Sequence, residues 1–455
     1  MNLFEKIFKL KEHQTNVKTE VLAGVTTFMT MAYILAVNPS MLSVTGMDNG
    51  AVFVATALAS FVGTILMALL SNYPFALAPG MGLNAYFAYT VVLGMGYSWQ
   101  FALTAVLVEG IIFIILSLTK VREAIFNAIP QSLKIAVSAG IGLFIAFIGL
   151  QNAKIVVPNA STAVSFFDFS SAPFKSVGIT VVLAIIGIII TAILLIKNVK
   201  GGILFGILST WILGIICQIT GLYVPNAELG MYSLIPDFSN GLSIPSIAPT
   251  LCKFQFANIL TLDFLVIMFS FLFVDMFDTL GTLIGVSSKA NMLDKDGKLP
   301  KIKGALMADS VATVAGACFG TSTTTTFVES ASGVASGGRT GLTSVVTGLL
   351  FLLSLFLSPI FLAIPSFATA PALVIVGFMM LSSILKLNFE DYSESIPAYL
   401  CIIAMPFMYS ISEGICFGII SYVVINLLTG KAKEKKIHPI LYVLTVLFIL
   451  RYILL

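Results

Sequence analysis

The residues of this sequence that are equipped for chemistry are a few acids and amides inside apolar segments. Glu329 follows seven small or hydroxylated residues, Gly320 to Thr326, and precedes Gly333, so it closes a stretch that makes a poor membrane helix. Non-helical backbone at membrane depth is tolerated where protein buries it or where it lines a wet cavity, and an ionisable group there marks a candidate functional site. We expect Glu329 to bind a ligand or carry a proton; the alternative is a carboxylate that only neutralises a helix N-terminus.

Asp275 and Asp278 lie three residues apart in a long apolar segment without lysine or arginine. At this spacing both carboxylates lie on neighbouring parts of one helix face. Burial and like charge together favour a proton on at least one of them near neutral pH. We expect Asp278 to contact substrate and Asp275 to lie behind it or carry a proton; the alternative is that either acid is neutral and only supports packing.

Several other polar and aromatic residues are weaker candidates for substrate contact. Asn84 follows a Pro/Gly interruption (Pro79, Gly80, Gly82), where the alternative role of asparagine is a helix cap. The remaining candidates are threonines, which in spans usually bond to their own backbone, and aromatic rings, which could stack on a planar ligand; they are Thr26, Thr27, Thr326, Phe327 and Tyr86. Three more membrane acids, Glu109, Asp309 and Glu413, are expected to be structural or to relay protons.

The elements that position these residues are transmembrane helices. The chain is 58% hydrophobic and 10% charged, with a mean hydropathy of +1.04, and continuous apolar runs of about 20 residues recur along it. This composition predicts an all-α polytopic protein of the lipid bilayer; the unbroken runs exclude a β-barrel, and nothing suggests nucleic acid as a partner. Five cysteines and two histidines form neither a disulfide framework nor a metal-ligand pattern, and there is no ATPase motif. We therefore expect no metal, no cofactor and no enzyme activity.

Fourteen spans are expected, and the basic residues orient them. The spans are predicted at 20–42, 50–70, 76–95, 98–118, 133–153, 176–196, 200–222, 262–286, 303–319, 323–337, 340–363, 370–386, 394–409 and 411–429. A final apolar run, 440–455, is expected to be an interfacial helix, with a fifteenth span as the alternative. Twenty lysines and arginines then fall on the cytoplasmic side against three outside, Lys154, Lys175 and Lys253, which predicts that both termini are cytoplasmic.

The spans divide into two halves of seven. An N-terminal amphipathic segment (1–19) precedes the first repeat (20–222), an external loop (223–261) leads to the second repeat (262–429), and 430–455 is a cytoplasmic or interfacial end. An odd number of spans inverts the second half relative to the first, as in secondary transporters, and interruptions at equivalent places mark the binding site. The third span of each half is interrupted here, at 77–84 and at 320–333.

Four stretches of the sequence resemble one family of transporters. They are Ala23–Ile34, Pro79–Tyr86, Phe277–Thr282 and Thr323–Ser330. Taken together they are similar to the AzgA-like purine permeases of the nucleobase:cation symporter-2 (xanthine/uracil permease) family, and the resemblance runs over nearly the whole chain. By this resemblance Asp278 falls at the eighth-helix carboxylate, Glu329 at the tenth-helix Glu/Gln and Asn84 at the third-helix asparagine.

The resemblance implies a fold, a substrate and a coupling ion. The fold would be the UraA-like 7+7 inverted repeat, in which spans 1–4 and 8–11 form a core domain, the others form a gate, and short strands replace helix in the third and tenth spans. The protein would be a plasma-membrane symporter, often a homodimer, for adenine, guanine or hypoxanthine and H⁺. Thr26, Thr27 and Thr282 differ from the uracil and xanthine branches, which argues against those substrates.

Three other function classes are weaker. An anion transporter of the same architecture would have to accept two central acids that repel anions. A passive nucleobase channel would not need inverted interruptions. An intramembrane aspartyl protease would need a Gly-x-Gly-Asp element, which the sequence lacks. Between adenine and guanine/hypoxanthine the sequence leaves the choice open, because one donor/acceptor exchange on the base decides it.

Overall fold

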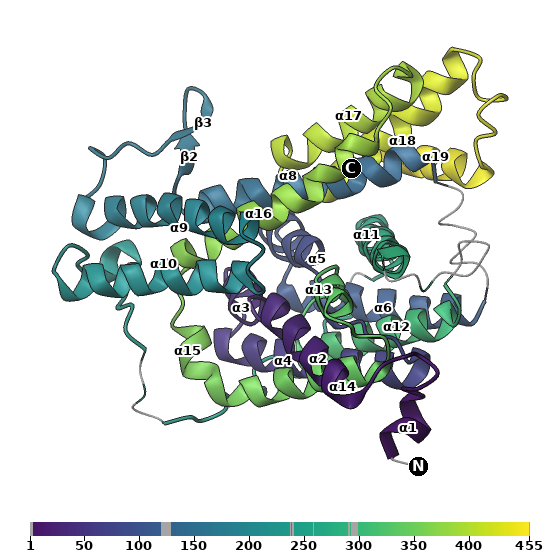
Figure 1. Ribbon diagram of the computed structural model, residues 1–455. Helices are drawn as coiled ribbons and strands as arrows, with labels where there is room; N and C mark the ends of the chain where they lie inside the picture. The colour runs from purple at the N-terminus through teal and green to yellow at the C-terminus, as the bar shows by residue number, and fades with distance from the viewer. Residues whose placement is uncertain are drawn as a thin grey trace.

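The chain is a bundle of membrane helices. The computed structural model describes residues 3–119, 129–236, 238, 241–257, 259–289, 292 and 299–454 (Figure 1). Ten helical segments of this part are long and apolar enough to cross a membrane, by length and composition. The mostly helical polytopic fold is confirmed, whereas the number fourteen stays an expectation. Four basic residues used above for orientation lie outside the described residues: Lys120, Arg122, Lys295 and Lys298.

One group of helices, the core, is built from both halves of the chain. The first half contributes α2 (Val17–Met31), α3 (Ile34–Ser43), α4 (Asn49–Ser71), α5 (Met81–Ala85), the π-helix η1 (Tyr86–Gly94) and α6 (Trp99–Leu118). The second half contributes α11 (Leu262–Lys289), α12 (Ile302–Phe319), α13 (Ser330–Ala335), α14 (Gly341–Leu353) and α15 (Ser358–Leu362). The two halves interleave, since α4 packs against both α12 and α14, and α2 packs against α13 and α14.

A second group of helices, the gate, runs in Figure 1 from α9 and α10 at the left to α17 and α18 at the upper right. It comprises α8 (Gln131–Asn152), α9 (Ile179–Ile196), α10 (Gly202–Ile219), α16 (Ser366–Leu381), α17 (Tyr392–Phe407) and α18 (Ile411–Leu428). Helix α16 packs against α8 and α9, and α17 packs against α8 and α18, so these helices too come from both halves. Sequence order and packing therefore agree with the expected division into core and gate.

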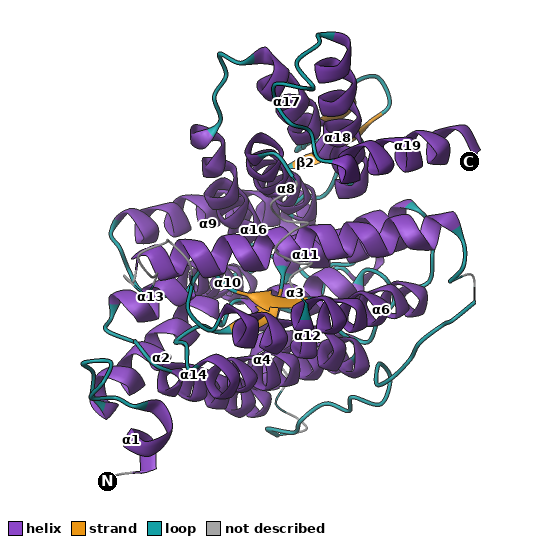
Figure 2. Cartoon of the chain, turned by 90° about the vertical axis from the view of Figure 1, so that its right-hand side faces the viewer, coloured by secondary structure: helices purple, strands orange, loops and turns teal. Residues whose placement is uncertain are grey.

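Two short strands cross inside the core, where the third and tenth spans were expected to be interrupted. They are β1 (Leu77–Pro79) and β4 (Thr324–Thr326), and Figure 2 shows them enclosed by helices. The strands are antiparallel, with Leu77 opposite Thr326 and Pro79 opposite Thr324. Pro79 has no N–H for a helix and threonine is β-branched, so both segments favour an extended backbone. Pairing with each other satisfies backbone groups that the bilayer cannot solvate.

The surroundings of the two strands repeat across the pseudo-two-fold relation of the halves. The hydroxyl of Thr64 on α4 donates to the carbonyl of Leu77 (3.2 Å), and that of Thr313 on α12 donates to the carbonyl of Thr324 (3.0 Å). A Cβ atom on Gly63, the residue before Thr64, would lie 2.8 Å from Cβ of Ala312, the residue before Thr313. Helices α4 and α12 therefore cross in contact at equivalent positions, which supports an inverted repeat.

Three smaller elements lie outside this repeat. Helix α1 (Leu3–Phe8) begins the amphipathic segment expected at the N-terminus, where Phe8 and Leu10 are buried against Ala68 and Leu342. A hairpin of β2 (Val156–Asn159) and β3 (Ala163–Phe166), which the sequence analysis did not predict, joins α8 to α9.

Helix α19 (Pro439–Leu454) lies antiparallel to α18. It begins after the turn that ends α18, yet the hydroxyl of Tyr452, near its other end, donates to Glu413 at the start of α18. Phe448 also contacts Phe269 of α11, with ring centroids 6.0 Å apart. Helix α19 is shorter than the ten candidate spans, and its interfacial placement stays an expectation.

Candidate functional site

Asp278 lies on α11 against the interruption of the third span. A Cβ atom on Gly80, which follows β1, would lie 2.4 Å from Cγ2 of Thr325 and 3.6 Å from Oδ2 of Asp278. The first distance is far below van der Waals contact, so only glycine lets β1, β4 and α11 come this close. The partly exposed carboxylate of Asp278 is thereby held at the end of β1.

Glu329 lies at the other interruption and is oriented by a tyrosine from the first span. It caps the start of α13, three residues after β4, and its side chain is also partly exposed. The hydroxyl of Tyr33 donates to Oε1 of Glu329 at 2.7 Å. Tyr33 is only 1% exposed and lies where α2 ends and α3 begins, so its ring has little freedom to move. Glu329 therefore has a fixed hydrogen-bond donor on one oxygen.

Asp278 lies within electrostatic range of two other acids. Coulombic interactions connect Asp278 with both Glu329 and Asp309. In the described part of the chain no lysine or arginine lies within ion-pair distance of Asp278 or Glu329. Such a pair can accept hydrogen bonds from the N–H groups of a neutral ligand and can exchange a proton, but it opposes the entry of an anion.

Asn84 lies at the strand crossing but is completely buried. Its amide nitrogen donates to the carbonyl of Pro79 (3.4 Å), and its amide oxygen accepts a short hydrogen bond from the hydroxyl of Ser322. These bonds join the interruption of the third span to that of the tenth. The expectation that Asn84 binds substrate stays a proposal, and these two bonds use one of its two N–H donors and one of the two lone pairs of its oxygen.

The threonines of the first span bond mainly within their own helix. Thr26 donates to the carbonyl of Leu22 (2.9 Å) and Thr27 to that of Ala23 (3.0 Å), which is the alternative considered above. Thr30, one turn later, is partly exposed and lies 3.5 Å from the carbonyl of Glu329. Of the three threonines, Thr30 is therefore the one that contacts the site.

The expected residues of the tenth span lie in or next to β4. Thr326 pairs with Leu77 in the ladder, and the amide of Phe327 donates to the carbonyl of Ala76 (2.9 Å); both side chains are buried. Tyr86 is also buried and packs edge-to-face on Phe271 of α11, with centroids 4.8 Å apart. The rings of Phe327 and Tyr86 are therefore part of the packed core around the paired strands.

Three further acids lie behind the strands. Asp275 and Asp309 both contact the hydroxyl of Thr279, at 3.1 and 2.8 Å, and Glu109 of α6 accepts from the hydroxyl of Thr323 at 2.8 Å. All three carboxylates are completely buried. Asp275 is thus completely buried, whereas Asp278, three residues later on α11, is partly exposed.

Sequence reasoning missed Tyr33 and Thr279 as parts of this region. A signal for Tyr33 was present, because a tyrosine hydroxyl inside an apolar span must find a partner. Thr279 lies between Asp278 and a leucine in one of the quoted stretches, yet nothing in the sequence shows that its hydroxyl meets Asp309, 30 residues away.

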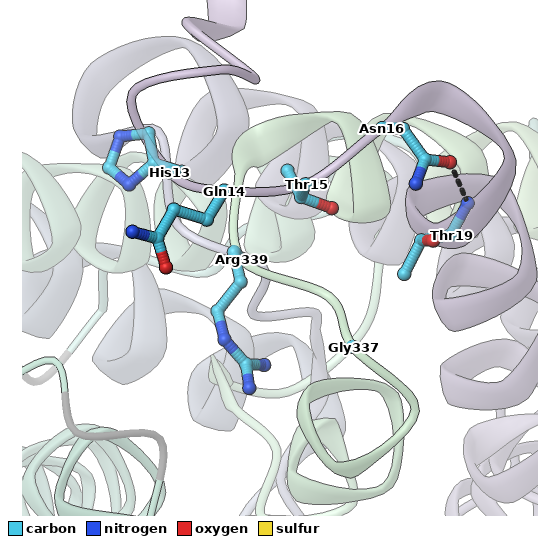
Figure 3. Close-up of a pocket in the computed structure, with 7 residues that line it drawn as sticks. All are labelled: His13, Gln14, Thr15, Asn16, Thr19, Gly337 and Arg339. Carbon is cyan, nitrogen blue, oxygen red and sulfur yellow. Dashed lines mark hydrogen bonds between the residues drawn. The ribbon is translucent and has the colours of Figure 1, made fainter.

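A separate cavity of about 290 Å³ opens between the N-terminal segment and the loop before α14 (Figure 3). It is lined by His13, Gln14, Thr15, Asn16, Thr19, Gly337 and Arg339, which do not include Asp278 or Glu329. Two hydrogen bonds of the Arg339 guanidinium go to the carbonyls of Val334 and Gly338, both at 2.7 Å. Buried Glu20 accepts from Arg339 N, Thr340 and Thr343, which anchors the start of α14 to α2. These hydrogen bonds hold the N-terminal segment and the loop before α14 against the core.

Comparison with known proteins decides the family. A model described as the permease family, that of the xanthine/uracil permeases, matches residues 18–417. The chain belongs to this family, the nucleobase:cation symporter-2 family.

Its relatives are similar over their whole length. The guanine/hypoxanthine permease PbuG of Bacillus subtilis is 46% identical over 457 residues (98% of each chain). The adenine permease AdeP of Escherichia coli is 42% identical over 453 residues (99% of this chain, 96% of that one). A Methanocaldococcus jannaschii protein with only a general permease name is 50% identical over 453 residues (100% and 99%). The resemblance stated from four motifs is therefore confirmed.

Solved structures share the fold across other substrates. The transmembrane domain of the cyanobacterial bicarbonate transporter BicA has a TM-score of 0.63 at 18% identity, over 88% of this chain and 97% of that one. The murine anion transporter Slc26a9 has a TM-score of 0.63 at 12% identity, over 90% of this chain and 68% of that one. The UraA-like architecture of this permease is thus confirmed, and the identities carry no information on its substrate.

Proposed function

We propose that this permease imports purine nucleobases across the plasma membrane by proton symport. The observation that carries the proposal is that Asp278 and Glu329 both lie next to the paired strands β1 and β4, Asp278 beside Gly80 and Glu329 three residues after β4. A purine offers ring and exocyclic N–H donors to these carboxylates, while its acceptor nitrogens and oxygen can meet backbone amides at the strand ends and Asn84. The names of PbuG and AdeP support adenine, guanine and hypoxanthine as substrates.

The proposal extends to ion coupling, orientation and assembly. The membrane-embedded acids Glu329, Asp278 and Asp275 are the candidate carriers of the coupled proton. The distribution of lysine and arginine supports a cytoplasmic position for both termini. A homodimer is the assembly that the family resemblance implies.

The test is uptake of radiolabelled adenine, guanine and hypoxanthine by cells that lack their own purine permeases. Uptake is expected to rise as external pH falls from about 8 to about 6, the range into which buried carboxylates can be shifted, and to collapse with a protonophore. Strict sodium dependence without a response to the protonophore would refute proton coupling. Uptake that merely equilibrates the base would instead indicate a passive channel.

An anion transporter of the same architecture is the second candidate. Asp278 and Glu329 disfavour it, since the described part of the chain has no lysine or arginine within ion-pair distance of either acid. Bicarbonate or chloride flux without purine uptake would reverse this preference.

A further inference from the structure

One hydroxyl group behind the strands has three oxygen neighbours. Oγ1 of Thr279 lies 3.1 Å from Oδ1 of Asp275, 2.8 Å from Oδ1 of Asp309 and 3.1 Å from Oγ1 of Thr325. The four side chains come from α11, α12 and β4, and none is more than 1% exposed. Two carboxylates and two hydroxyls therefore share one dry volume, which we call the Thr279 cluster.

Counting protons shows what this geometry needs. A threonine hydroxyl has one hydrogen to donate and two lone pairs that accept. Thr279 can point its hydrogen at one carboxylate, and the contact with Thr325 is satisfied if Thr325 donates. The other carboxylate then faces a lone pair of Thr279, and that contact is a hydrogen bond only if the carboxyl group itself carries a proton. Both contacts of Thr279 with the carboxyl groups are hydrogen bonds when Asp275 and Asp309 hold one proton between them.

We infer that the Thr279 cluster, Asp275–Thr279–Asp309, is the binding site of the transported proton, separate from the acids that contact the base. This inference rests on the proposed proton symport and names the site of its ion. Binding of a proton to the cluster changes the charge on Asp309, and Asp309 interacts electrostatically with Asp278. With the cluster protonated, Asp278 is relieved of like-charge repulsion and is a better ionised acceptor for an N–H of the base. Proton and base therefore favour each other's binding, as symport requires.

Strand β4 provides a second connection between the Thr279 cluster and the base. Thr325 contacts Thr279 by its hydroxyl, its backbone pairs with Ala78, and its methyl group lies close to Gly80. A base seated at the strand ends presses on the same strand that supplies Thr325 to the cluster. Proton release on the inner side is then tied to departure of the base.

Other charged groups on the elements around this part of α11 are predominantly acidic. They are Asp278 on α11, Glu109 on α6, Glu329 after β4, Glu413 at the start of α18 and Lys134 near the start of α8. Negative charge on these acids favours a cation at the cluster. Because two carboxylate and two hydroxyl oxygens could also bind Na⁺, sodium is an outcome that the test must separate.

The experiment uses the purified full chain in proteoliposomes and two transport modes. The first is purine accumulation driven by an imposed pH gradient, acidic outside. The second is exchange of labelled for unlabelled purine without a gradient, which needs base binding and translocation but no net proton movement. The variants are Thr279→Val, which keeps the shape and removes the hydroxyl, Thr279→Ser, which restores it, and Asp309→Asn. Thr210→Val is the matched control, because Thr210 is a buried threonine bonded to its own helix at Gly206.

Thr279→Val and Asp309→Asn are expected to lose gradient-driven accumulation by about tenfold or more, equivalent to about 1.4 kcal/mol of coupling, while exchange persists. Thr279→Ser and Thr210→Val should retain both modes. A parent-like gradient response in Thr279→Val overturns the inference, as does a proportional loss of exchange and accumulation in Thr279→Val and Asp309→Asn at normal membrane abundance. Accumulation that follows a sodium gradient instead also overturns it. A parent chain that exchanges purine but ignores the pH gradient would refute proton symport itself.

Discussion

The core and the gate each contain a cluster of acids, and the two are built in opposite ways. In the gate, Lys435 contacts Asp391 at 2.5 Å and Glu394 at 2.9 Å, and Lys431 lies 3.6 Å from Asp391. In the core, the hydroxyls of Tyr33 and Thr279 contact Glu329, Asp275 and Asp309. A lysine fixes a carboxylate in its charged form, whereas a hydroxyl can serve either protonation state. The gate acids are therefore suited to hold helix ends together, and the core acids are suited to gain and lose protons.

The protonation behaviour of the gate follows from its lysine. The hydrogen bond from Lys435 holds the pKa of Asp391 well below its usual range. Burial acts to lower the pKa of Lys435, but its hydrogen bonds to Asp391 and Glu394 outweigh this and raise it. Both groups stay ionised throughout the range in which transport would respond to pH, so the pH dependence of uptake should originate in the core.

The sharpest test of this comparison exchanges one acid in each region. Asp278→Asn removes the acceptor charge at the strand crossing and is expected to abolish purine uptake while leaving membrane abundance unchanged. Asp391→Asn, the matched control in the gate, should retain most uptake. Labelled purine uptake normalised to protein in the membrane measures both. Similar uptake by Asp278→Asn and the parent would remove Asp278 from the site.

Glu329→Gln separates ligand from proton carrier. The substitution keeps an acceptor oxygen but removes charge, and losing a charged hydrogen bond costs about 1.5–3 kcal/mol, or roughly ten- to more than hundredfold in affinity. If the proton binds at the Thr279 cluster, the affinity falls and the pH profile of uptake survives. A flattened pH profile of uptake would instead indicate that the coupled proton binds at Glu329. If neither quantity changes, Glu329 only neutralises the start of α13.

Tyr33→Phe removes the donor to Glu329 and leaves the ring in place. Because Tyr33 acts on the purine only by orienting Glu329, purine affinity should fall by a few-fold to about tenfold, about 0.5–1.5 kcal/mol. Tyr73→Phe is the control, since the hydroxyl of Tyr73 donates to the carbonyl of Pro300 and lies apart from the site. Equal effects of the two substitutions on purine affinity would mean that Tyr33 supports packing alone.

Lys435→Ala should have the smallest effect, a loss of thermal stability of the gate of about 1 kcal/mol or less, because the pair is partly exposed. The lowered pKa of Asp391 contributes stability that is present above about pH 4 and lost below it. The raised pKa of Lys435 contributes stability that is lost only above about pH 10. The stability difference from the parent should therefore be constant between pH 5 and 9, which thermal unfolding in detergent can measure. A difference that changes across this range would contradict the ion-pair account.

The parts of the molecule that were predictable from sequence are those with a local signal. The two interruptions, the division into halves and the position of Asp278 and Glu329 next to the interruptions all stand out because polar residues, glycine and proline are rare in apolar spans. The register of β1 on β4, the bond from Tyr33 to Glu329 and the hub at Thr279 were not predictable, because each joins segments whose proximity is set by helix packing. The contacts of α19 with Glu413 and Phe269 were not predictable for the same reason, since they join α19 to residues distant from it in the sequence.

The pairing of β1 with β4 also has a consequence in time. The residue that pairs with Leu77 is Thr326, which is synthesised about 250 residues later, so β1 has no partner strand until then. At roughly 5–20 residues per second of synthesis, the first half spends on the order of 10–50 s in the membrane with these backbone groups unpaired. Unpaired backbone in hydrocarbon is costly, so the nascent third span must be sheltered during this interval by helices already inserted or by the insertion machinery. A chain that stops before β4 would then be a substrate for membrane proteolysis, and slow translation ahead of Gly320 would lower the yield of the whole protein.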